Sequence, residues 1–81
     1  MDKIEITILR KLYIHKKIGG SHTSIDNLPK GFPKQLHKDV LVAAKELIKE
    51  GFLLSKPTHY GLEVSLNPRR INDIEKIIGI K

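Results

Sequence analysis

Residues 33–66 read PKQLHKDVLVAAKELIKEGFLLSKPTHYGLEVSL, and this stretch decides the fold. At about 100° per residue, its first half gathers the apolar side chains in one sector of a helical wheel and a mostly cationic set in the opposite sector. Pro33 suits the first position of a helix, and Gly51 suits the position after its end. We expect an amphipathic helix that ends near Glu50, with Leu36, Val40, Ala43, Ala44 and Leu47 inward and Lys34, Lys38, Val42, Lys45 and Lys49 outward.

The second half of this stretch has the pattern of a β-hairpin. Residues 51–56 begin apolar and suit a strand, and residues 57–61 combine a proline and a glycine, as turns do. Residues 62–66 alternate apolar and polar side chains with period two, which is typical of a half-buried strand. We expect two antiparallel strands directly after the helix.

The N-terminal part predicts a helix that is buried on more than one side. Asp2 can cap a helix beginning near Lys3. That helix should end before Gly19-Gly20, with Lys16 and Lys17 in its last turn, where the helix dipole favours cations. Its apolar residues form two stripes, Ile4, Ile8 and Leu12 in one and Ile6, Leu9 and Tyr13 in the other.

The remaining segments are short. Residues 21–25 suit a short strand, and residues 26–33 leave room for at most one helical turn, capped by Asp26, with Leu28 and Phe32 reaching inward. Asn67-Pro68 has the cap-then-proline pattern that starts a last helix. One face of that helix carries Ile71, Ile74 and Ile78, with Ile77 and Ile80 left over.

Length and composition limit the class of protein. The 81 residues are enough for one domain and too few for two. There is no cysteine, so disulfides and thiolate metal sites are excluded. No apolar run approaches the ~20 residues of a membrane span, and acidic residues interrupt any signal-peptide core at the N-terminus. We therefore expect a cytoplasmic protein without a membrane partner.

The charge of the chain is unevenly distributed. The formal net charge is +6, and between Arg10 and Lys38 seven basic residues stand against the single acid Asp26. An ordinary lysine-rich surface is one explanation of a positive charge. The concentration of charge in one segment favours the other, a polyanionic partner.

The order of expected elements resembles that of winged helix-turn-helix proteins, especially the compact prokaryotic ones. Residues 46–53, ELIKEGFL, are similar to the end of a recognition helix and the start of a wing, and residues 62–66, LEVSL, to the returning strand. The resemblance implies an α+β, mostly α fold in a single domain over residues 1–81. Residues 1–66 would form the core and wing, and residues 67–81 an extra C-terminal helix. The second helix must be very short, because residues 26–33 are poor in helix formers.

The resemblance also implies binding to double-stranded DNA, as a transcription regulator or chromatin-associated factor. Lysines along an exposed helix face can meet phosphates in a major groove, while Gln35 can bond an adenine edge and Val42 a thymine methyl group. The hairpin tips of winged helices lie on the DNA backbone. Arg69-Arg70 stands in the first turn of the last helix, where the helix dipole disfavours cations, so the pair is either a further phosphate contact or a tolerated pair on the surface. The nucleic-acid-binding candidates are Lys30, Lys34, Gln35, His37, Lys38, Val42, Lys45, Lys56, Thr58, His59, Tyr60, Arg69 and Arg70.

Other kinds of site are not indicated. The four histidines match no compact metal motif, and no glycine-rich phosphate loop or catalytic triad pattern is present. We therefore expect no enzyme activity, metal or cofactor. A protein-interaction module, with Phe32, Leu41 and Val42 in a contact patch, and an RNA-binding module stay open as alternatives.

The surplus of apolar residues allows two arrangements. Ile6, Tyr13, Ile77 and Ile80 could pair two copies in a two-fold dimer, setting two recognition helices about one DNA turn apart. Alternatively, the last helix folds onto the first helix of the same chain and uses these residues there.

Overall fold

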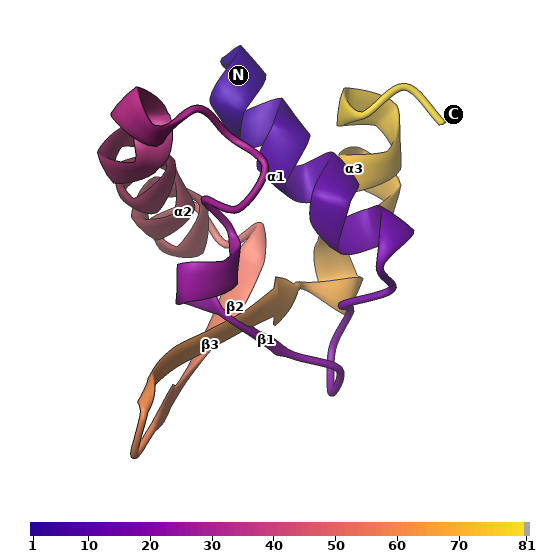
Figure 1. The fold of residues 1–81 in the computed structure, drawn as a ribbon. Helices are drawn as coiled ribbons and strands as arrows, with labels where there is room; N and C mark the ends of the chain where they lie inside the picture. Colours follow the sequence, from indigo (N-terminus) through magenta and orange to yellow (C-terminus); the bar gives the residue numbers. More distant parts are fainter. Residues whose placement is uncertain (81) are drawn as a thin grey trace.

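The computed structural model describes residues 1–80, which form an α+β fold of three α-helices and a three-stranded antiparallel sheet (Figure 1). The helices lie on one side of the sheet, and one hairpin projects beyond them. The expected α+β class is thus confirmed. The elements are α1 (Lys3–Ile14), β1 (Thr23–Ser24), α2 (His37–Lys49), β2 (Leu53–Thr58), β3 (Gly61–Leu66) and α3 (Ile71–Ile77), with 3-10 turns η1 (Ile25–Asn27), η2 (Lys34–Leu36) and η3 (Pro68–Arg70).

Helix α1 begins as expected and ends earlier than expected. The side chain of Asp2 accepts a hydrogen bond from the Glu5 backbone N–H, and the Glu5 carboxylate accepts one from the Asp2 N–H, which forms a capping box. At the other end the helix stops at Ile14, so Lys16 and Lys17 lie beyond it rather than in its last turn. Lys16 adopts the left-handed conformation, with φ of 56°. That conformation ends a helix, because it turns the next N–H groups back to its last carbonyls.

The connection from α1 to α2 is mostly irregular. β1 pairs with the central strand β3, and η1 follows it. The cap of η1 is the hydroxyl of Ser24, which accepts from the Asp26 N–H, so the expectation that Asp26 is the cap is wrong. Leu28 is buried and Phe32 half-buried against the core, as expected.

The predicted helix over residues 33–50 is present in two parts. Pro33 precedes the 3-10 turn η2, and the α-helix proper starts at His37. Leu36 is therefore half-buried in the turn rather than buried in the core. Gly51 ends α2 with φ of +84°, and the N–H of Phe52 donates to the Leu47 carbonyl at 3.0 Å.

The strands of the hairpin are shifted from their expected bounds, since β2 covers Leu53–Thr58 rather than residues 51–56 and β3 begins at Gly61 rather than at residue 62. β2 pairs with β3 from Leu53↔Leu66 to Thr58↔Gly61, so Pro57 and Thr58 belong to the strand. Only His59 and Tyr60 form the turn, which corrects the expected turn over residues 57–61. Thr23↔Val64 pairing places β1 on the other edge of β3, giving the order β1-β3-β2.

The C-terminal segment folds back onto α1. The side chain of Asn67 caps η3 by accepting from the Arg69 N–H, and α3 follows. The phenol of Tyr13 donates to the Glu75 carboxylate at 2.5 Å, and the guanidinium of Arg10 donates to the Ile78 carbonyl at 3.2 Å. The last helix therefore packs on the first helix of its own chain, which was one of the two expected arrangements.

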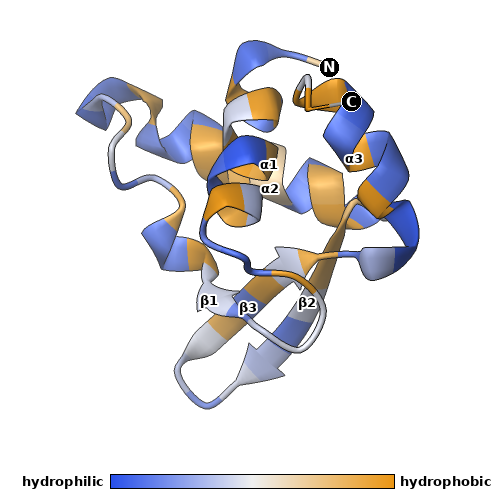
Figure 2. Cartoon of the chain, turned by 90° about the vertical axis from the view of Figure 1, so that its right-hand side faces the viewer, coloured by the Kyte–Doolittle hydropathy of each residue, from blue (hydrophilic) through white to orange (hydrophobic). Residues whose placement is uncertain are grey.

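Three of the four residues expected at a dimer contact are used within the chain instead. Ile6, Tyr13 and Ile77 pack against the core of their own chain, whereas Ile80 is 54% exposed. The core lies between the helices and the sheet, and Figure 2 shows the apolar stretches of both in orange. Within residues 1–80, no helix has both the length and the apolar character needed to cross a membrane. The largest fully buried side chains include Ile8, Leu9, Leu12, Leu28, Leu47, Leu53, Leu66 and Ile74.

Candidate nucleic-acid interface

The exposed side of α2 carries two parallel stripes of opposite charge. Lys38, Lys45 and Lys49 are exposed and follow one another at intervals that bring them to one line along the helix; we call them the lysine stripe. Each is followed directly by an acid, so the acids form a second line about 100° further round the helix. The members of this acid stripe are Asp39, Glu46 and Glu50.

The acid stripe borders a hollow that α1 extends. The hollow has a volume of about 450 Å³ and lies between α2 and the first turn of α1, with Asp2 and Glu5 of α1 on its wall. Val42, which is 55% exposed, also lines it. Five carboxylates line this hollow, two from the start of α1 and three from α2, and they make this side of α2 repel phosphate.

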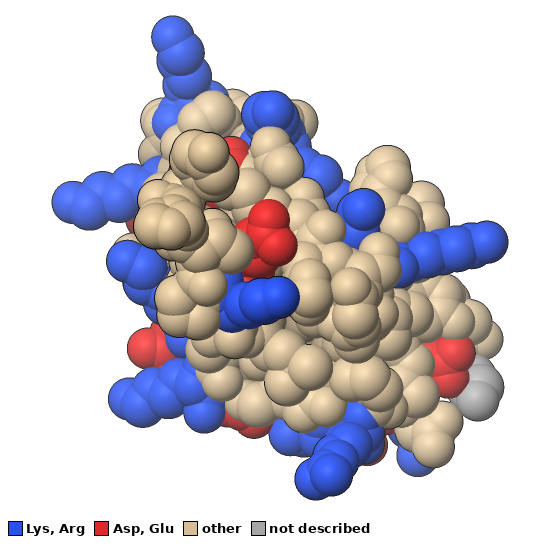
Figure 3. Space-filling model, turned by 90° about the horizontal axis from the view of Figure 1, so that it is seen from below, with Lys and Arg blue, Asp and Glu red and all other residues tan. Residues whose placement is uncertain are grey.

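The lysine stripe lies in the middle of the exposed side, opposite the buried Val40, Ala44 and Leu47. Its three ammonium groups have no ion-pair partner among residues 1–80. Seen from below, basic side chains project around most of the rim of the face that carries the hairpin, including the side on which α2 lies (Figure 3). The acidic side chains visible on this face are fewer. An extended anion would meet mainly positive charge there.

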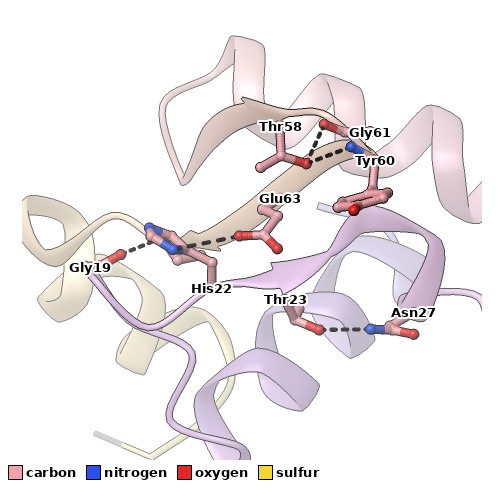
Figure 4. Close-up of polar contacts among 9 residues, drawn as sticks. Gly19, His22, Thr23, Asn27, Thr58, Tyr60, Gly61 and Glu63 are labelled. Atoms are coloured by element: carbon pink, nitrogen blue, oxygen red, sulfur yellow. Dashed lines mark hydrogen bonds and ion pairs between the residues drawn. The ribbon is translucent and has the colours of Figure 1, made fainter.

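The tip of the hairpin is held in shape by one hydroxyl. Oγ1 of Thr58 donates to the Gly61 carbonyl at 3.1 Å and accepts from the Tyr60 N–H at 3.3 Å (Figure 4). Gly61 has φ of +134°, which an L side chain rarely adopts. The side chain of Tyr60 is 97% exposed, and His59 beside it is exposed as well. A rigid turn thus presents an unpacked aromatic ring to solvent.

The body of the hairpin carries one basic and one acidic residue face to face. Lys56 pairs in register with Glu63, and Nδ1 of His22 lies 3.8 Å from the Glu63 carboxylate (Figure 4). Side chains that pair across antiparallel strands share a face. The carboxylate of Glu63 therefore reduces the positive potential around Lys56.

One candidate, His37, has a structural contact of its own, and three others lie exposed before α2 begins. Nε2 of His37 lies 3.0 Å from the Phe32 carbonyl, which ties the start of α2 to the preceding loop. Lys30 is exposed on that loop, and Lys34 and Gln35 are exposed in η2, which precedes the lysine stripe in the chain. The structure thus brings Lys38 and Lys45 together and leaves the others at the margin.

The two arginines after β3 differ from each other. Arg70 places its guanidinium 4.1 Å from the Phe52 ring centroid and donates to the Glu50 carbonyl at 3.2 Å and to the Asp73 carboxylate at 3.0 Å. These contacts explain a cation at this position without a phosphate. Arg69 is exposed.

Lys49 was not among the nucleic-acid-binding candidates that the sequence indicated. Its position in the lysine stripe follows from the helical spacing that already selected Lys38 and Lys45, so the signal was present in the sequence. No group of three or more metal-ligand side chains that could hold an ion occurs in residues 1–80. Comparison of the chain with protein-family models, curated proteins and solved structures found no match.

Proposed function

We propose that the chain is a winged-helix protein that binds double-stranded DNA through the lysine stripe of α2 and the β2–β3 hairpin. In this proposal it acts in the cytoplasm as a transcription regulator or a chromatin-associated factor. The support for this assignment is the resemblance of residues 40–66 to winged helix-turn-helix proteins together with the charge pattern of α2.

The observation that carries the proposal is the lysine stripe. Lys38, Lys45 and Lys49 lie in line on a rigid helix whose other side is anchored by the buried Val40, Ala44 and Leu47. A helix with side chains is about 10–12 Å wide and fits a major groove of about 12 Å. The acid stripe then faces sideways, and the helix lies with that flank tilted toward the mouth of the groove, because phosphates repel the carboxylates.

The hairpin adds a second contact region in this proposal. It projects beyond the helices, so it can reach the DNA backbone beside the groove that α2 occupies (Figure 1). Lys56, His59 and Tyr60 supply a cation, an imidazole and an aromatic ring with a hydroxyl. Thr58 shapes the turn rather than contacting DNA, since its hydroxyl is engaged within the hairpin.

The test measures binding of a labelled duplex of about 20 bp, two turns of DNA, over a series of salt concentrations. The variant carries Lys38→Ala and Lys45→Ala, and the matched control carries Lys3→Ala and Lys76→Ala, two exposed lysines on α1 and α3. Loss of two phosphate contacts should lower the slope of log K against log salt by about 1.8 for the stripe variant only.

Two results would overturn the proposal. Equal weakening by both double variants means that net charge alone drives binding, and no face is selected. Tighter binding of the unmodified protein to single-stranded or duplex RNA than to duplex DNA, at the same salt concentration, assigns it to a different nucleic acid.

A further inference from the structure

A second hollow lies on the outer side of α1, away from the acid stripe. It has a volume of about 380 Å³ and is formed between the second half of α1 and the loop over residues 30–32. Figure 1 shows this loop rising beside α1 on its way to the start of α2. Ile14, which is 65% exposed, and the half-buried Phe32 give the hollow an apolar floor. Its other lining residues include the cations Arg10, Lys11 and Lys30 and the imidazole of His15.

The hollow is preformed, because the loop is fastened to α1. Nζ of Lys11 donates to the backbone carbonyls of Lys30 at 2.7 Å, Asn27 at 3.0 Å and Leu28 at 3.4 Å. The His37 ring contacts the Phe32 carbonyl from the other side. A ligand therefore finds the two walls already in place and need not order a mobile loop.

The charge of the hollow is of one sign. No acidic residue of the described chain lines it, and burial, followed by repulsion from Lys30, lowers the pKa of Lys11. An anion bound there would offset this repulsion. The apolar floor adds a second requirement for the ligand. Bare phosphate gains nothing from contact with Ile14 or Phe32, whereas an apolar group is stabilised there because it leaves water.

We propose that this hollow, the α1–loop groove, binds an acidic peptide segment of a partner protein. A large apolar side chain of the partner enters between Ile14 and Phe32, and its flanking carboxylates lie near Lys30 and His15. The positive charge of the lining residues complements the carboxylates of this peptide, and the apolar floor suits its large apolar side chain. The groove is separate from the lysine stripe, so a protein with both surfaces can hold a nucleic acid and a partner together.

The test uses a fluorescein-labelled peptide, Glu-Asp-Leu-Phe-Asp-Glu, and two control peptides. Glu-Asp-Ser-Ser-Asp-Glu keeps the charge without the apolar pair, and Lys-Lys-Leu-Phe-Lys-Lys keeps the apolar pair with reversed charge. Fluorescence anisotropy with the full chain should show binding of the first peptide and at least tenfold weaker binding of both controls. Equal binding of the serine peptide would contradict an apolar floor and overturn the proposal.

Variants locate the site. Ile14→Ser and Lys30→Glu change exposed side chains, and each should weaken binding of the first peptide at least tenfold while the circular dichroism spectrum stays unchanged. Lys49→Glu on the lysine stripe makes the same charge change elsewhere and should leave peptide binding intact. An equal loss in Lys49→Glu shows non-specific attraction and rejects the groove.

A spectroscopic measurement separates this proposal from DNA binding. Backbone amide shifts of Ile14 and Phe32 should move on addition of the peptide and stay in place on addition of duplex DNA. Movement with DNA alone assigns the groove to nucleic acid and overturns the peptide proposal. Because peptide binding is measured without DNA, its failure and the failure of DNA binding are distinguishable.

Discussion

The phenol of Tyr13 on α1 donates a 2.5 Å hydrogen bond to the carboxylate of Glu75 on α3, 62 positions further along the chain. This bond, with the contact from Arg10 to the Ile78 carbonyl, holds the last helix on the first. The hydrogen bond to Glu75, followed by burial and by the charge of Glu75, raises the pKa of Tyr13. The protonated phenol is thus the form that the folded protein favours.

The first prediction is a pH-dependent contribution of Tyr13 to stability. A raised folded pKa means that the contribution is fully present below the unfolded pKa of about 10 and is lost as pH rises through the folded value. Tyr13→Phe should therefore be less stable than the unmodified protein at about pH 8, and the gap should narrow at a second pH chosen above the folded pKa of Tyr13. Urea unfolding at both pH values measures the gap. Tyr60→Phe, a change in a fully exposed ring, is the control and should show no gap at either pH.

The ends of the helices show how much of the fold the sequence could predict. All three helices end in the same arrangement, in which two successive N–H groups turn back to the last carbonyls. In α2 the left-handed residue is Gly51, the usual choice, and the predicted end is correct. In α1 that residue is Lys16. Because glycine is the usual residue at this position, the sequence predicted that the helix would end just before Gly19, which is too late. A non-glycine residue in this conformation carries no sequence signal.

One part of the candidate surfaces could be predicted from the local sequence, whereas the other depends on contacts between distant segments of the chain. The lysine stripe follows from helical spacing alone, which is why Lys38 and Lys45 could be selected from the sequence. The α1–loop groove could not, because it depends on Lys11 reaching carbonyls 16 to 19 positions away. The structural role of Arg70 could not be predicted for the same reason, since its partners Phe52 and the Glu50 carbonyl come from another part of the chain.

The second prediction separates the two arginines. Arg70→Ala should lower the free energy of unfolding by about 1–2 kcal/mol, because it removes the stacking on Phe52 and the hydrogen bond to the Glu50 carbonyl. Arg70→Lys should restore little of this loss, since an ammonium cannot stack and bond in the same planar geometry. Arg69→Ala, which removes the same charge from an exposed side chain, should change stability by less than about 0.5 kcal/mol. Chemical denaturation of the three variants tests the difference, and equal losses for Arg69→Ala and Arg70→Ala would contradict it.

The third prediction concerns the acid stripe. If α2 meets DNA through the lysine stripe, the acids lie off the duplex and act only through space. Asp39→Asn combined with Glu46→Gln should then strengthen duplex binding a few-fold at ~10 mM salt and have no effect near ~150 mM, where screening acts within about 8 Å. Binding isotherms at the two salt concentrations decide this. A persistent gain at the higher salt concentration would place the acids in the interface and reverse the assigned orientation of α2.

The fourth prediction concerns the tip of the hairpin. Tyr60 is 97% exposed, so its ring adds almost nothing to the packing of its own chain, and Tyr60→Ala should leave the free energy of unfolding unchanged. If the tip contacts DNA, the same change should weaken duplex binding by about threefold to tenfold, because a ring lying on sugar or base surface is lost. Thr58→Val is the complementary variant, since it keeps the shape of the side chain and removes the hydroxyl that bonds to Gly61 and Tyr60. It should loosen the turn and weaken binding while Tyr60 is still present. Unchanged affinity of both variants, measured beside an affected Lys38→Ala and Lys45→Ala protein, would remove the hairpin from the interface and leave α2 as the whole of it.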